Sequence, residues 1–85
     1  MNLDRLRDEL EGIVMDVVAG GPNTDKLHKS IRRVLDQRLR REIGAEVKGY
    51  DVKVGPDRTG EGIQVEILLH TRQQVERIRL GARLF

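Results

Sequence analysis

The sequence predicts an α+β fold in which two N-terminal helices pack on a small antiparallel sheet, in the order α-α-β-β-β. Three observations lead to this prediction. Apolar residues recur at helical spacing as far as Gly44, they alternate with polar residues beyond it, and glycine-rich stretches separate the segments. A chain of 85 residues divided in this way is expected to form one domain, residues 1–85.

The first segment predicts a helix over residues 2–19. Its apolar residues share one face, and its acidic residues lie elsewhere on the helix. Asn2 is a suitable N-cap, and Gly20-Gly21-Pro22 is expected to end the helix. The apolar face consists of Leu3, Leu6, Leu10, Ile13, Val14 and Val17.

The second segment predicts a helix over residues 24–43, with Asn23-Thr24 as its N-cap. Ile43-Gly44 is interpreted as a C-terminal turn closed by a left-handed glycine. Arg38 falls within the apolar arc and is interpreted as a snorkelling side chain. The apolar arc is Leu27, Ile31, Val34, Leu35 and Leu39, and the opposite face carries Lys26, Lys29, Arg33, Gln37, Arg40 and Arg41.

Strict alternation after Gly44 predicts strands over residues 47–54 and 62–70, joined as a hairpin by a turn-rich loop. The residues expected to face the helices are Tyr50, Val52, Val54, Ile63, Val65, Ile67 and Leu69.

The C-terminal segment fits two patterns. A helix would align Val75, Ile78, Ala82 and Phe85, whereas a strand over residues 76–84 would align Ile78, Leu80, Ala82 and Leu84 opposite Arg77, Arg79 and Arg83. The strand is favoured, because the alternation is strict and Gly81 disfavours a helix.

The composition argues against an enzyme. The two histidines lie on different elements, cysteine is absent, the single serine has no glycine-flanked elbow, and aromatic residues make up 2% of the chain. We therefore expect no catalytic site, no cofactor and no metal. No apolar run approaches the roughly 20 residues that span a bilayer, and the N-terminus has no signal-like region, so synthesis in the cytoplasm without membrane insertion is expected.

A small core without disulfides favours association with other chains. The net charge is +2, but residues 1–21 carry two basic and five acidic groups (−3) and residues 22–44 carry seven basic and three acidic groups (+4). These segments can attract each other within one chain or between copies, so a homo-oligomer is expected.

The last strand is the predicted means of assembly. A terminal alternating strand either completes its own sheet or is donated to a neighbour by β-augmentation, and the two readings are nearly balanced. Truncation after Arg77 is expected to abolish assembly while leaving the helices folded. The predicted interface residues are Ile78, Leu80, Leu84 and Phe85 for strand docking and Arg33, Arg40 and Arg41 for electrostatic pairing.

The competing hypothesis is a nucleic-acid-binding module that uses the basic face of the second helix. Phosphates could be followed, without reading sequence, by Lys26, Lys29, Arg33, Arg40 and Arg41. Asp36 within that face and the scarcity of aromatic stacking residues make this reading less favoured than assembly.

The chain also resembles the C-terminal domain of contractile-tail sheath proteins of phages and related injection systems. The resemblance runs from the N-terminal amphipathic helix through PNTDKLHKSIRRVLDQRLRREIG, the strand GYDVKV, the loop GPDRTGEG and the strand IQVEILL to the closing VERIRLGARLF. Residues at matching places are Asn23, Thr24, Leu27, Ile31, Leu35, Gly44, Tyr50, Val52, Ile63, Val65, Ile67, Glu76, Ile78 and Leu80.

The resemblance extends to the small sheath-initiator proteins of baseplates, although Arg41-Glu42-Ile43-Gly44 stands where their Glu-Pro-Arg motif is expected. A full sheath subunit is several times longer, so we expect a small tail or neck component built on the terminal module. The family implies a sheet completed by strands of neighbouring subunits. It also implies partners that are copies of the chain or other tail proteins, and a place in the virion or injection particle.

Overall fold

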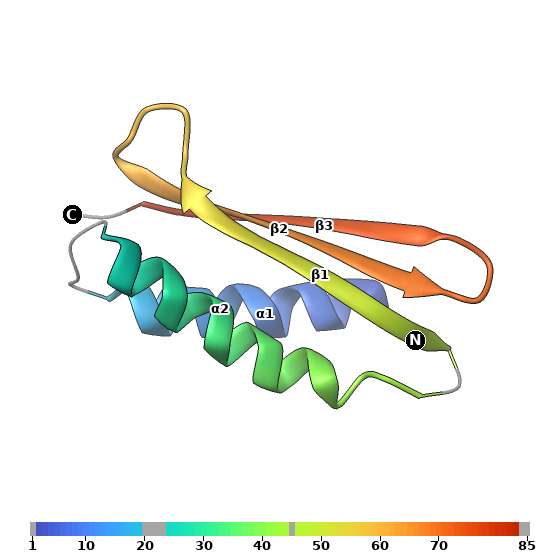
Figure 1. Ribbon diagram of the computed structural model, residues 1–85. Coiled ribbons are helices and arrows are strands. Elements are labelled where there is room, and N and C mark those ends of the chain that lie inside the picture. The colour runs from blue at the N-terminus through green and yellow to red at the C-terminus, as the bar shows by residue number, and fades with distance from the viewer. Residues whose placement is uncertain (1, 20–23, 45, 84–85) are drawn as a thin grey trace.

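The computed structural model describes residues 2–19, 24–44 and 46–83, which form two helices followed by a three-stranded antiparallel sheet (Figure 1). The fold is α+β in the predicted order, and both helices cover the same face of the sheet. Helix α2 lies against β1, and α1 lies against β3. The elements are α1 (Leu3–Val18), α2 (Asp25–Arg40), β1 (Val47–Pro56), β2 (Gly62–Thr71) and β3 (Val75–Arg83), and the strand order is β1-β2-β3.

Both helices begin at side chains that cap their free N–H groups. Asn2 Oδ1 accepts a hydrogen bond from the Arg5 amide at 3.1 Å, and Thr24 Oγ1 accepts one from the Leu27 amide at 3.2 Å. Asn2 and Thr24 are therefore the caps that the sequence predicted. The predicted helix breaker Gly20-Gly21-Pro22 and the neighbouring Asn23 lie outside the described residues.

Helix α2 ends at Arg40, three residues before the predicted end at Ile43. Beyond Arg40 the chain tightens into turns, in which the Glu42 amide bonds Leu39 O at 2.9 Å. The prediction that Gly44 adopts a left-handed conformation is wrong, because among the described residues it is Gly60 that has a positive φ, of 76°. The Gly44 amide instead donates to Val47 O at 3.0 Å, so the chain turns directly into β1.

The core lies between the helix layer and the inner face of the sheet. Every residue predicted to face the helices does so, although Tyr50 and Val54 are half-buried at the margin. The buried core residues are Leu6, Leu10, Val14, Val18, Ile31, Leu35, Leu39, Val47, Val52, Ile63, Val65, Ile67, Leu69, Ile78, Leu80 and Ala82.

The ambiguous C-terminal segment is a strand over Val75–Arg83. It pairs with β2 inside the same chain, with Ile78 opposite Ile67 and Leu80 opposite Val65. The segment is therefore a strand and not a helix, as the strict alternation in the sequence favoured. Leu84, the last residue of the predicted strand, and Phe85 lie outside the described residues.

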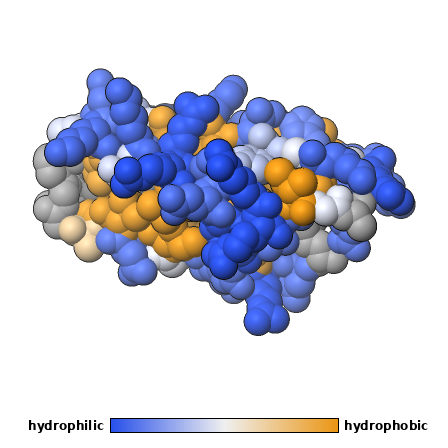
Figure 2. Space-filling view, turned by 60° about the horizontal axis from the view of Figure 1, so that its bottom comes forward, coloured by the Kyte–Doolittle hydropathy of each residue, from blue (hydrophilic) through white to orange (hydrophobic). Residues whose placement is uncertain are grey.

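The helix-bearing side of the molecule is largely hydrophilic, with apolar patches between the charged side chains (Figure 2). The large apolar side chains that are exposed in the described part of the chain are Met15, Ile43 and Val75. Neither α1 nor α2 has the length and apolar character that crossing a membrane would require.

Candidate assembly interface

Strand β3 forms one edge of the sheet. It pairs with β2 on one side, and no described residue pairs with its other side. We call that other side the β3 edge. An edge strand presents a row of backbone N–H and C=O groups that can pair with a strand from another chain. The β3 edge is therefore the first candidate for an interface.

The hairpin between β2 and β3 determines which backbone groups reach the β3 edge. The Thr71 amide donates to Gln74 O at 2.9 Å, so these two residues form a hydrogen-bonded pair. Hydrogen-bonded and non-hydrogen-bonded pairs alternate along an antiparallel ladder. In the observed register the hydrogen-bonded pairs include Ile67 with Ile78, and the intervening residues of β3 direct their backbone groups outward. These are Val75, Arg77, Arg79, Gly81 and Arg83.

The same residues place their side chains on the outer face of the sheet, opposite the helices. Three of them are arginines, and all three are exposed. Arg79 Nε lies 3.5 Å from Glu66 Oε2 on β2, while Arg77 and Arg83 have no ion pair with any described residue. The β3 edge therefore carries a row of positive charge along its outer face.

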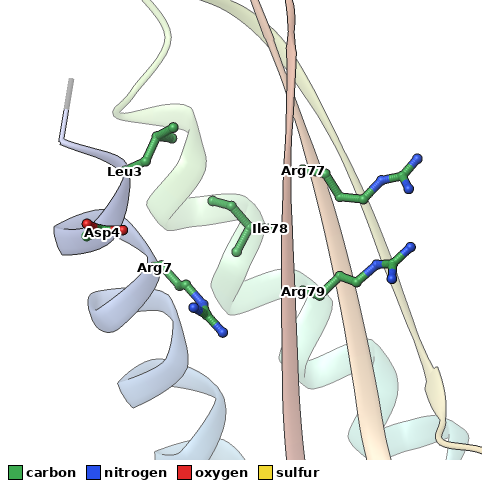
Figure 3. A pocket seen from close by; sticks show the side chains of 6 residues that line it. All are labelled: Leu3, Asp4, Arg7, Arg77, Ile78 and Arg79. Atoms are coloured by element: carbon green, nitrogen blue, oxygen red, sulfur yellow. The ribbon is translucent and has the colours of Figure 1, made fainter.

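A shallow, open groove of about 560 Å³ lies between α1 and β3. Figure 3 shows Ile78 pointing toward α1 and Arg77 and Arg79 pointing the other way. Ile78 is nearly buried, and Leu3 is half-buried on the facing wall. The groove thus offers apolar contact beside the β3 edge. We call it the α1–β3 groove, and its lining is Leu3, Asp4, Arg7, Arg77, Ile78 and Arg79.

The opposite edge of the sheet, on β1, is partly blocked. The Gly44 amide occupies Val47 O, and the register shifts between Val47 and Gly49. Pro56, which has no N–H to donate, ends the strand. Tyr50 also donates its hydroxyl to the Asp36 carbonyl on α2 at 3.2 Å. Of the two edges, β3 is the longer uninterrupted one.

The predicted strand-docking residues lie in the chain's own core. Ile78 and Leu80 are 6% and 5% exposed and contact the helix layer rather than solvent. In this arrangement β3 presents its backbone edge and its outward side chains at the surface. Leu84 and Phe85 lie outside the described residues.

The predicted electrostatic residues lie on a different part of the surface. Arg33, Arg40 and Arg41 are exposed on and just beyond α2, on the side of the molecule that carries β1. Arg40 Nη2 lies 3.0 Å from Asp36 Oδ2, and hydrogen bonding to Tyr50 together with the Asp36 charge raises the pKa of Arg40. The structure therefore does not bring the two predicted halves of the interface together.

The guanidinium of Arg38 is held by two carboxylates, whereas the snorkelling prediction placed it in solvent. Its Nη2 lies 2.6 Å and its Nε 3.0 Å from Glu9 Oε2 on α1, and its Nη1 lies 2.7 Å from Glu42 Oε1. Hydrogen bonds to Glu42 and Glu9 raise the pKa of Arg38, and the hydrogen bond from Arg38 lowers the pKa of Glu9. Two N–H groups of Arg38 thus converge on one carboxylate oxygen of Glu9, and this ion pair ties α1 to α2.

The residues considered for chemistry are dispersed. His70 Nε2 lies 2.9 Å from Asp51 Oδ2 on the outer face of the sheet, and His28 and Ser30 lie on α2. Among the described residues, no three His, Cys, Asp or Glu side chains come together as a metal site. No family model, no curated protein and no solved structure matches this chain.

Proposed function

We propose that this chain is a structural assembly protein that joins a neighbouring subunit by β-augmentation at the β3 edge. The observation that carries the proposal is the row of outward-directed backbone groups from Val75 to Arg83, with which no described residue pairs, beside an open groove. A strand added there would form main-chain hydrogen bonds along the edge and place alternate side chains in the groove.

The resemblance to sheath C-terminal domains supports a particular setting for this activity. In that family the sheet is completed by strands of neighbouring subunits. We therefore propose that the chain is a component of a contractile phage tail or a related injection machine. Its neighbours would be copies of itself or other tail proteins.

The position of β3 favours addition of a strand over donation of β3. Ile78, Leu80 and Ala82 complete the chain's own core, so removing them would expose the helices. The truncation after Arg77 that the sequence suggested is for this reason a poor test, because it would remove part of the core together with the edge.

A proline at position 79 tests the proposal without removing the core. The Arg79 amide faces outward, so Arg79→Pro removes a donor from the edge and leaves the bonds to β2 intact. Arg79→Ala is the matched control, since it removes the same side chain and keeps the amide. Circular dichroism checks that both variants fold, and Arg77→Pro provides a second edge-blocking variant.

The measurement is incorporation into tail particles purified from cells that produce them, quantified by mass spectrometry. We expect the wild type and Arg79→Ala in the particles, and both proline variants to be depleted from them. Particles that lack the wild-type chain, or that contain folded proline variants at the wild-type level, would contradict the proposal.

A second candidate function rests on a basic cluster at the start of α2. Lys26, Lys29 and Arg33 surround a shallow depression together with Ser30, and the three cations have no ion pair with any described residue. Such a cluster could hold phosphates without reading sequence. We expect changing all three to glutamate to remove any retention on DNA or RNA at low salt. If the wild-type chain is not retained on DNA or RNA at low salt, this second candidate function is ruled out.

A further inference from the structure

We infer that the β3 edge selects an extended acidic segment of another protein and rejects a second copy of β3. This inference rests on the proposed function, because it specifies the strand that the edge accepts. The argument depends on which side chains an added strand would meet.

A strand added antiparallel to β3 forms hydrogen-bonded pairs with the residues whose backbone groups face outward. In such pairs, directly opposite side chains lie on the same face with Cβ atoms about 5.5 Å apart or less. The side chains opposite Arg77, Arg79 and Arg83 therefore lie beside three guanidinium groups on the outer face. Of these, only Arg79 has an ion-pair partner among the described residues, at 3.5 Å. Carboxylates at those positions would form cross-strand ion pairs.

The alternate residues of the added strand face the α1–β3 groove. They meet the α1 wall of the groove, where Leu3 lies beside Asp4 and Arg7, and the flank of Ile78 on β3 (Figure 3). Apolar side chains fit against Leu3 and Ile78. The edge and the groove together define a segment that alternates apolar and acidic residues.

A second β3 fails this requirement. Hydrogen bonding between two β3 edges pairs outward residues with outward residues. In every antiparallel register that overlaps more than half of the nine-residue strand, at least one arginine then lies opposite another. Like charges directly opposite each other are destabilising. Charge therefore disfavours a two-fold β3–β3 dimer.

The other strands of the chain do not supply the acidic segment. On the outer face, β1 offers Asp51 and then Lys53, and β2 offers Glu66 between Gln64 and Leu68. None of the described strands has carboxylates at two successive outward positions. The occupant is therefore a strand of a different protein. Arg77, Arg79 and Arg83 select this strand by its negative charge, and we call this selection the charge filter.

The test uses two fluorescein-labelled peptides of equal length, one alternating valine with glutamate and the other alternating valine with lysine. Fluorescence anisotropy at low salt should show the glutamate peptide binding the whole chain at least tenfold more tightly than the lysine peptide. Arg79→Pro should abolish this binding. The triple variant Arg77→Glu, Arg79→Glu, Arg83→Glu should reverse the preference, because it retains the backbone edge and inverts its charge.

Equal binding of the two peptides, tighter binding of the lysine peptide, or no binding of either would overturn the inference. A dimer of the wild type that light scattering detects and Arg79→Pro abolishes would also overturn it. Particle incorporation that depends on the edge, without a peptide preference, would leave the proposed function standing and remove the charge filter. A clear peptide preference in a chain that is absent from tail particles would leave the charge filter standing and remove the proposed function.

Discussion

Arg79 and Glu66 lie opposite each other on the outer face of the sheet, with Arg79 Nε 3.5 Å from Glu66 Oε2. This ion pair occupies one flank of Arg79, and the other flank lies at the β3 edge. The same residue that forms a cross-strand ion pair with β2 thus also lies at the side of β3 that no described residue pairs with. An edge strand that carries outward arginines resists pairing with itself while keeping its backbone groups accessible.

The Arg38–Glu9 ion pair is expected to stabilise the contact between the two helices. Arg38 is 16% exposed and donates two hydrogen bonds to Glu9 Oε2, so Arg38→Ala should lower the free energy of unfolding by about 1 kcal/mol. Urea denaturation measures the change. Arg32→Ala, an exposed position on the same helix, is the control and should change stability by less than about 0.5 kcal/mol. Equal effects of the two substitutions would contradict a clamp between the helices.

The same ion pair predicts a dependence of stability on pH. The hydrogen bond from Arg38 lowers the pKa of Glu9 from its ordinary 4.5, so the contribution of ionised Glu9 is fully present above that value. It is lost as the pH falls through the lowered pKa. The difference in stability between the wild type and Glu9→Gln should therefore shrink progressively in acid below about pH 4.5. A difference that stays constant into strong acid would show that the Glu9 charge does not stabilise the fold.

Gly62 at the start of β2 is predicted to require glycine for steric reasons. A Cβ at this position would lie 2.7 Å from Ala82 O and would also collide with the Asp57 carboxylate. Gly62→Ala should therefore destabilise the chain by about 1–3 kcal/mol. Gly55→Ala is the matched control, because a Cβ at Gly55 has no neighbour within 4 Å. Thermal melts that rank the two variants equally would refute the steric explanation.

Leu80 tests whether β3 belongs to its own chain in solution. It is 5% exposed in the core, so Leu80→Ala should cost about 2–4 kcal/mol, whereas Arg77→Ala on the outer face should cost little. In a closed sheet the urea midpoint of the wild type does not change with protein concentration. A midpoint that rises with concentration would indicate that β3 is exchanged between chains.

Periodicity was sufficient to predict the element types and the core. The change from helical spacing to alternation at Gly44 correctly separated helices from strands, and the alternating Ile78, Leu80 and Ala82 correctly indicated a strand. These predictions succeed because amphipathic patterns report directly which side of an element is buried.

The end of α2 and the behaviour of Arg38 were not predictable in the same way. Gly44 suggested a left-handed cap, but the early pairing of Ile43 and Gly44 with Val47 replaces that cap, and such pairing depends on tertiary structure. Likewise, nothing in the local pattern indicates that Arg38 meets Glu9, 29 residues earlier in the chain.

The outward residues of the β3 edge are not the residues that the sequence analysis assigned to the interface. The alternation of Arg77, Arg79 and Arg83 was visible in the sequence, but their importance depends on β3 being an edge strand. The groove wall formed by Leu3, Asp4 and Arg7 becomes apparent only once α1 is known to lie beside β3.

Residue-resolved amide hydrogen exchange, measured by NMR with and without the valine–glutamate peptide, tests the β3 edge most directly. In the free chain we expect the amides of Arg77, Arg79 and Gly81 to exchange rapidly and those of Ile78, Leu80 and Ala82 to be protected by β2. On peptide binding, the first three amides should become protected while the second three remain as they were. Rapid exchange of Arg77, Arg79 and Gly81 in the bound chain would contradict docking of a strand at the β3 edge.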